Sequence, residues 1–132
     1  MDGRQGPYAA TEPGRTAVVG ADGPLDILQA RQLGAAARDL AAGGAGALVL
    51  DLTRTPSADP LGVLTLADEV AALARSGLAV ALCGMRPDLE QQLHRAGVSR
   101  KAAVCDTVTD ACRLLAVPAP ASPSPGAPPS RP

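Results

Sequence analysis

The sequence predicts an α/β protein with one domain, built on a mixed and mostly parallel β-sheet of about four to five strands with about four helices. Short runs rich in valine and leucine alternate with longer segments in which apolar residues recur at helical spacing. Alternation of this kind needs crossover connections, and these make neighbouring strands parallel. The chain has 132 residues, of which 46% are hydrophobic, so it can form a single core of this type.

The first strand is predicted at residues 16–20 (TAVVG), a short β-branched run. Pro13-Gly14 just before it is a turn dipeptide and can close a hairpin with residues 8–11. That pairing is antiparallel, which makes the sheet mixed. From Leu25 a helix is predicted up to Gly43-Gly44. Its apolar face follows the i, i+3, i+4, i+7 spacing and consists of Leu33, Ala36, Ala37, Leu40 and Ala41.

Residues 47–52 (ALVLDL) are predicted as a central strand, because they are apolar on both faces except at Asp51. A second helix follows Asp59 and ends at Gly77. Its broad apolar face consists of Val63, Leu66, Ala67, Val70, Leu73 and Ala74. Residues 78–83 (LAVALC) form the next apolar strand.

The last part of the domain alternates in the same way. Residues 87–96 are predicted as an amphipathic helix closed by Gly97. Residues 102–105 form a short last strand, and residues 109–116 a last helix capped by Thr107 or Thr109.

The ends of the chain differ in composition from the domain at residues 8–117. Residues 1–7 are expected to be a flexible N-terminus. Residues 118–132 are mostly Pro, Ala and Ser, which bury too little apolar surface to offset their ordering entropy, so we expect a disordered tail.

Composition excludes several classes of partner. Twelve basic and thirteen acidic residues give a net charge of −1 without clusters, so nucleic acid is not an expected partner. Tyr8 is the one aromatic residue, so bases have no stacking platform. We expect no membrane insertion and no secretory signal, which favours a cytoplasmic protein. The three cysteines form no even set and no Cys-x-x-Cys pair, and we expect buried thiols.

The most unusual loop is the one after the central strand, residues 53–62 (TRTPSADPLG). Open α/β sheets present binding groups in loops at the carboxyl ends of their strands. Asp59 can cap the second helix, and Pro60 suits the first helical position because its φ is already set. Helix capping alone accounts for these two residues, so a role in binding needs further support.

That support comes from a resemblance to the STAS domain family, which includes anti-sigma factor antagonists and the cytoplasmic domains of sulphate transporters. The resemblance covers about residues 10–115. It rests on the order and spacing of short motifs: Gly23-Pro24-Leu25-Asp26 where the family has Gly-x-Leu-Asp, the central strand 48–52 (LVLDL), Asp59-Pro60-Leu61-Gly62 where the family has Asp-Ser-Ser-Gly, Leu64, and Gly77-Leu78.

The resemblance implies a non-catalytic interaction domain that binds an anti-sigma factor kinase or a related signalling scaffold. In such antagonists the serine after the aspartate is phosphorylated, which adds about −1.5 to −2 charge at the contact and turns binding off. Here Pro60 occupies that acceptor position and Leu61 replaces the neighbouring serine. Neither side chain has a hydroxyl, so the usual switch cannot operate at this position.

The expected partner-binding residues are Asp26, Ser57, Asp59, Pro60, Leu61 and Gly62. Pro60 marks the degenerate phosphorylation position, and Ser57 is a substitute acceptor, with Thr55 and Thr65 as further hydroxyls near the site. An alternative within the family is a STAS subunit of an ABC-type lipid transport complex that docks on the ATPase. The sequence does not separate the two.

Other classes of function fit the sequence less well. A two-component receiver needs an acidic pair after its first strand to hold magnesium, and here a single Asp22 follows Gly20-Ala21. An enzyme needs a nucleophile with a base, or a metal cluster, whereas His94 has no second histidine and Cys83 has no adjacent cation. We therefore expect no catalytic residues, no metal and no cofactor.

Overall fold

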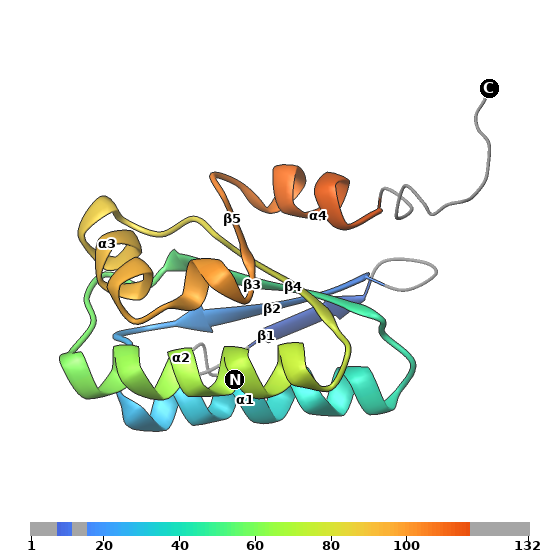
Figure 1. Ribbon diagram of the computed structural model, residues 1–132, viewed down its shortest axis with the longest axis horizontal. Coiled ribbons are helices and arrows are strands. Elements are labelled where there is room, and N and C mark those ends of the chain that lie inside the picture. Colours follow the sequence, from blue (N-terminus) through green and yellow to red (C-terminus); the bar gives the residue numbers. More distant parts are fainter. Residues whose placement is uncertain (1–7, 12–15, 117–132) are drawn as a thin grey trace, which may run out of the picture.

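The computed structural model describes residues 8–11 and 16–116. In this part of the chain one five-stranded sheet has its strands in sequence order (Figure 1). The strands are β1 (Tyr8–Thr11), β2 (Thr16–Asp22), β3 (Ala47–Arg54), β4 (Ala79–Cys83) and β5 (Ala103–Cys105). β1 is antiparallel to β2 and the other neighbours are parallel, so the predicted mixed, mostly parallel sheet is confirmed.

Four α-helices connect or follow the described strands. They are α1 (Ile27–Ala42), α2 (Pro60–Arg75), α3 (Pro87–Arg95) and α4 (Val108–Ala116). A single 3₁₀ turn, η1 (Val98–Arg100), lies between α3 and β5 and was not predicted. The α/β class and the helix number agree with the prediction.

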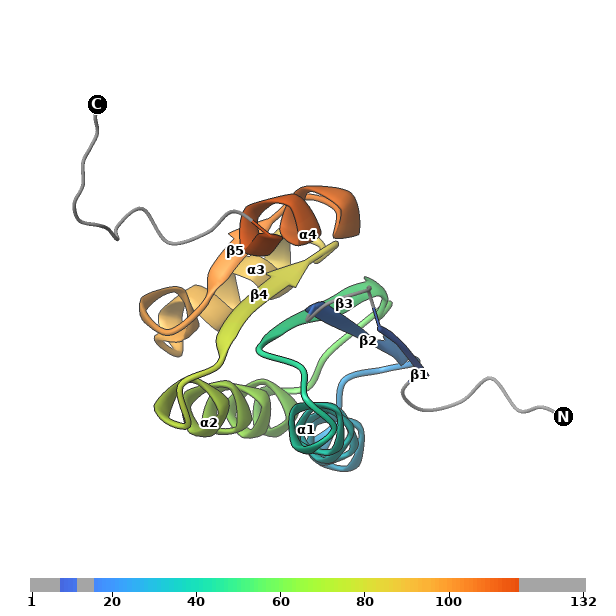
Figure 2. The same cartoon turned by 90° about the vertical axis from the view of Figure 1, so that its right-hand side faces the viewer.

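The helices cover the sheet unequally. Figure 2 shows α1 and α2 side by side on one face and α4 on the other. The sheet face covered by α1 and α2 holds the larger core. Leucines at alternate strand positions, such as Leu48, Leu50 and Leu82, pack in this core with Leu33 of α1 and Leu66 of α2. The α4 face is lined by smaller side chains: Val18, Val49, Ala81, Cys83 and Ala111. Period-two alternation along each strand produces these two layers.

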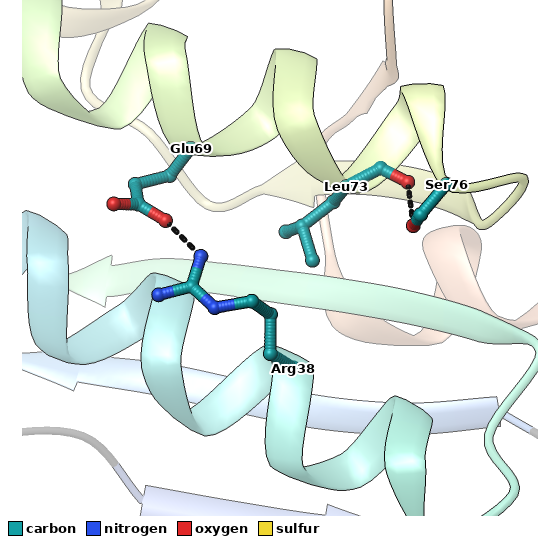
Figure 3. A network of polar contacts seen from close by, with 4 residues as sticks. All are labelled: Arg38, Glu69, Leu73 and Ser76. Carbon is teal, nitrogen blue, oxygen red and sulfur yellow. Dashed lines mark hydrogen bonds and ion pairs between the residues drawn. The ribbon is translucent and has the colours of Figure 1, made fainter.

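A close contact between α1 and α2 is possible because Gly34 has no side chain. A Cβ at Gly34 would overlap the side chain of Glu69, which crosses α1 at this point. The Glu69 carboxylate accepts a hydrogen bond from the guanidinium of Arg38 on α1 (Figure 3). On α2, Ser76 Oγ donates to the carbonyl oxygen of Leu73 at 2.7 Å and closes the helix end. The two helices lie side by side on one face of the sheet (Figure 2).

Several element ends differ from the sequence expectation. β2 and β3 each continue two residues further, because Asp22 pairs with Arg54 beyond a register shift in β2. α1 begins at Ile27 rather than Leu25, because Leu25 forms a bridge with Ala58. β4 and β5 each start one residue later than predicted. The cap of α4 is Thr107, whose hydroxyl oxygen accepts from Asp110 N at 3.0 Å.

The expectation of three buried thiols is wrong for two of the cysteines. Cys83 is fully buried, but Cys105 on the edge strand β5 and Cys112 on α4 are half-buried. Burial raises the pKa of the Cys83 thiol to about 12, with nearby Asp51 acting in the same direction. Burial and the nearby Asp110 and Asp106 also raise the pKa of Cys105.

The predictions for residues 1–7, for the Pro13-Gly14 turn and for the tail at 118–132 lie outside the described residues. Among the described helices none is long and apolar enough to cross a membrane.

Candidate partner-binding site

The loop between β3 and α2 ends in a capped helix start. Asp59 has extended backbone angles, and its Oδ1 accepts a hydrogen bond from Gly62 N at 2.6 Å. Pro60 is the first residue of α2 and is exposed. The cap satisfies one of the free amides of the first turn, and proline has no amide to satisfy. Capping therefore fixes the start of α2 at the position where the sequence departs from Asp-Ser-Ser-Gly.

α1 begins in the same way beside it. Oδ1 of Asp26 accepts from Gln29 N at 2.8 Å. The two helix starts are tied through Leu25, whose N donates to Ser57 O at 2.9 Å and whose O accepts from Asp59 N at 3.1 Å. The structure thus brings Asp26, remote in sequence, next to the loop that carries Ser57 and Asp59. All six residues expected to bind a partner lie at this junction.

Gly62 has a structural role within the junction. A Cβ at this position would overlap the backbone carbonyl of Leu25 and approach the Cα of Asp26. Gly62 is itself buried, so its contribution is to let the first turn of α2 lie against the chain before α1. This explains a glycine here without any direct contact to a partner.

The two helix starts carry a group of exposed aliphatic side chains, the helix-start patch, formed by Ile27, Leu28, Leu61 and Leu64. Their side chains are 36%, 64%, 59% and 54% exposed, respectively. Among the described residues only Val104 and Leu114 are comparably exposed large hydrophobics, and they belong to β5 and α4. Four such residues near the starts of two adjoining helices are more typical of an interaction surface than of leucines scattered singly over a surface.

Sequence reasoning missed Ile27 and Leu28. A signal was available for Leu28, which lies off the buried face of α1. Ile27 borders that face, because it stands three residues before buried Ala30 and seven before buried Gly34. A large aliphatic residue outside the core-facing stripe of an amphipathic helix indicates either an interface or surface scatter. What the sequence did not reveal was that the start of α2 lies beside these two residues.

The three hydroxyl side chains near the helix-start patch differ in access. Thr55 is 1% exposed, and its Oγ1 has no hydrogen-bond partner among the described residues. Thr65 is half-buried and its Oγ1 donates to Leu61 O at 2.7 Å. Ser57 is exposed in the loop. A kinase could reach Ser57 in the folded chain, whereas the burial of Thr55 keeps that hydroxyl out of reach.

Candidate catalytic groups elsewhere have ordinary structural surroundings. Asp51 is buried and accepts from Thr53 N at 3.0 Å and from the Thr53 hydroxyl. Lys101 is exposed and precedes β5. His94 is exposed, with its Nδ1 2.8 Å from Ser99 Oγ. In the described part of the chain, no three His, Cys, Asp or Glu side chains form a group that could hold a metal ion.

Comparisons with solved structures show the same fold. RsbS from Moorella thermoacetica superposes with a TM-score of 0.68 at 19% identity, over 82% of this chain and 92% of that one. The anti-sigma factor antagonist SpoIIAA in its unphosphorylated form gives 0.65 at 17% identity, over 84% and 97%. The STAS domain of a SulP transporter from Vibrio cholerae gives 0.58 at 22% identity, over 80% and 84%.

At these identities the likeness concerns the fold alone, and it includes both antagonists and transporter domains. No curated protein matches the sequence significantly. The family model of the STAS domain matches residues 8–111, which include all the described strands and almost all of the described residues. The chain therefore belongs to the STAS domain family.

Proposed function

We propose that this STAS domain is a non-catalytic anti-sigma factor antagonist, which binds an anti-sigma factor kinase in transcription or stress signalling in the cytoplasm and lacks the usual phosphorylation switch. The observation that carries the proposal is the helix-start patch, which lies on the same two helix starts as Asp26, Asp59 and Pro60. Family membership and the antagonist-like structural neighbours support the choice of partner.

The helix-start patch supplies the affinity for the partner. Leu28 and Leu61 are each more than half exposed, so covering either one removes a large part of an aliphatic side chain from water. Such burial contributes about 1 kcal/mol for each side chain. The junction is already held by capping and backbone hydrogen bonds, so little ordering entropy opposes docking.

The negative charge at the junction indicates which charge the partner carries. Asp26 and Asp59 are exposed carboxylates beside the apolar side chains, and each uses one oxygen to cap its helix. A complementary partner presents an apolar surface with a basic group near it. Such charge pairs act more on association rate and orientation than on total affinity.

Regulation differs from that of the antagonists that the sequence resembles. Pro60 and Leu61 offer no hydroxyl at the switch position. The domain therefore stays in a binding-competent form when the partner kinase and ATP are present, and its activity is set by its abundance.

Binding is tested with purified anti-sigma kinases from the same genome by titration calorimetry. Leu61→Ser is expected to weaken binding about tenfold, which corresponds to about 1.4 kcal/mol. Asp59→Lys is expected to weaken it at least as much. Leu114→Ser is the matched control, because Leu114 is 50% exposed on α4. If Asp59→Lys leaves binding intact, the proposed surface is wrong, and a transporter ATPase as the only binder supports the lipid-transport alternative.

The missing switch is tested by mass spectrometry after incubation with the binding kinase and ATP. The chain is expected to keep its mass, whereas Pro60→Ser, which restores a hydroxyl, is expected to gain one phosphate. Stoichiometric phosphate on Ser57, Thr55 or Thr65 of the unaltered chain would contradict the absence of a switch.

A further inference from the structure

A pocket of about 480 Å³ opens on the part of the molecule formed by α3, η1 and β5. It shares no residue with the helix-start patch. Its wall contains the side chains of Met85, Pro87, Glu90, Gln91, Leu93, His94, Val98, Ser99 and Val104. The volume falls in the range of about 300 to 1,000 Å³ that is typical of sites for small molecules.

The position of the pocket favours a ligand site. Met85 and Pro87 follow the carboxyl end of β4, which is the end of a parallel strand where α/β proteins place ligands. The opposite wall is Val104 of β5, the edge strand of the sheet. β5 has three residues, so it offers few backbone hydrogen bonds to an added peptide strand. A compact molecule fits this site better than an extended peptide.

The pocket has an apolar base and a polar outer wall. The base consists of core side chains, since Leu93 and Val98 are each 2% exposed, and Met85 and Val104 extend this apolar surface toward the opening. The outer wall is the face of α3 that carries Glu90 and His94. His94 is engaged with Ser99 through Nδ1, at 2.8 Å. The pocket therefore accepts a molecule with an aliphatic body and a polar head at the opening.

Glu90 determines the charge of that head. Its carboxylate makes no hydrogen bond or ion pair with any residue that the structure describes. Arg95 and Arg100 are exposed on the same elements but do not line the pocket. Apart from the titratable imidazole of His94, Glu90 supplies the formal charge of the wall, and that charge is negative.

We propose that the pocket bounded by α3, η1 and β5 binds a small amphipathic cation, such as an aliphatic amine, with the alkyl chain on Met85, Leu93, Val98 and Val104 and the ammonium group at Glu90. The site is separate from the partner-binding surface and does not depend on the function proposed for it.

The test uses n-octylammonium and octanoate, which share an apolar tail and differ in the charge of the head. Each is titrated below its micelle concentration into the full chain, with backbone amide shifts followed by NMR. Octylammonium is expected to shift amides of α3, η1 and β5 in a saturable way and to bind about threefold more tightly than octanoate, as for an exposed ion pair.

Three variants connect the binding to the site. Glu90→Gln is expected to remove the preference for the ammonium head and keep the weak binding of the tail. Asp39→Asn changes an exposed carboxylate on α1 and is expected to leave the preference unchanged. Ser99→Trp fills the opening at an exposed position and is expected to abolish both titrations, with the amide spectrum showing that the fold is kept.

The proposal is overturned if octanoate binds as tightly as octylammonium, if Glu90→Gln leaves the preference in place, or if the saturable shifts lie at Leu28 and Leu61. Protection of β5 amides by a lysine-containing extended peptide, with no binding of octylammonium, would replace the small molecule with a partner strand and also overturn it.

Discussion

The junction of α1 and α2 differs in shape from the pocket beside β5. The junction is a projecting surface, whereas the pocket is a hollow. At the junction both helices have aspartate caps, and Leu25 ties their starts together, so large aliphatic side chains point outward from a fixed base. α3 has no side-chain cap, and it lies beside a pocket under a three-residue edge strand. A fixed projecting surface suits a protein partner, and a hollow one suits a small molecule.

The sharpest test of this contrast compares two leucines on α2. Leu66→Ala is expected to lower the free energy of unfolding by about 3 kcal/mol, because Leu66 is fully buried and its loss leaves a cavity. Leu64→Ala, at a side chain that is 54% exposed, is expected to change it by less than about 0.5 kcal/mol. Urea denaturation measures both. A large loss for Leu64→Ala would mean that the helix-start patch serves the fold.

Close contact at the junction is tested next. Gly62→Ala is expected to cost about 2 kcal/mol, since the new Cβ overlaps the Leu25 carbonyl and forces the two helix starts apart. Gly43→Ala is the control, because at Gly43 φ is −82° and the new Cβ meets backbone oxygens at 3.5 Å and 3.6 Å. Its cost is expected to stay below about 0.5 kcal/mol in the same denaturation experiment. Equal costs for the two variants would remove the reason given for Gly62.

Loss of a helix cap is expected to lower stability at the start of α2 but not at the start of α3. Asp59→Ala is expected to cost about 1 kcal/mol through loss of the bond to Gly62 N. Arg86→Ala changes the cap residue of α3, which makes no side-chain cap bond, and is expected to cost about 0.3 kcal/mol or less. Thermal unfolding of both variants measures the difference. Similar losses would show that the two helix starts are equally dependent on their caps.

The last comparison concerns Thr53 near the end of β3 and Thr55 directly after it. Thr55→Val is expected to leave stability unchanged or to raise it by up to about 1 kcal/mol, because the buried hydroxyl of Thr55 has no partner among the described residues. Thr53→Val is expected to lower stability by about 1 kcal/mol, because the Thr53 hydroxyl donates to buried Asp51. Equilibrium denaturation of both variants measures the change in the free energy of unfolding and its sign. A loss for Thr55→Val would indicate that its hydroxyl is bonded in solution.

Much of the fold was predictable because its signals are local. Apolar runs and helical spacing predicted β2 to β5 and the four described α-helices, since burial on one face or two imposes a period on the sequence. β1 was predicted from the turn dipeptide Pro13-Gly14. The errors in the prediction concern the first and last residues of strands and helices. The shift of the α1 start from Leu25 to Ile27 depends on a bridge to Ala58, which no pattern near Leu25 encodes. The single turn of η1 is too short to have a periodic signal.

By itself the sequence determined the α/β class, the helix cap at Asp59 with a proline directly after it, and the absence of a hydroxyl at Pro60 and Leu61. These follow from residue identity and local spacing. The tertiary structure alone decided that Asp26 meets the loop of Ser57, that the start of α1 with Ile27 and Leu28 lies beside the start of α2, and that Thr55 is buried. It also placed Glu90 on the wall of a pocket closed by β5. The physical reason is that these features depend on contacts between segments remote in the chain, and only packing brings such segments together.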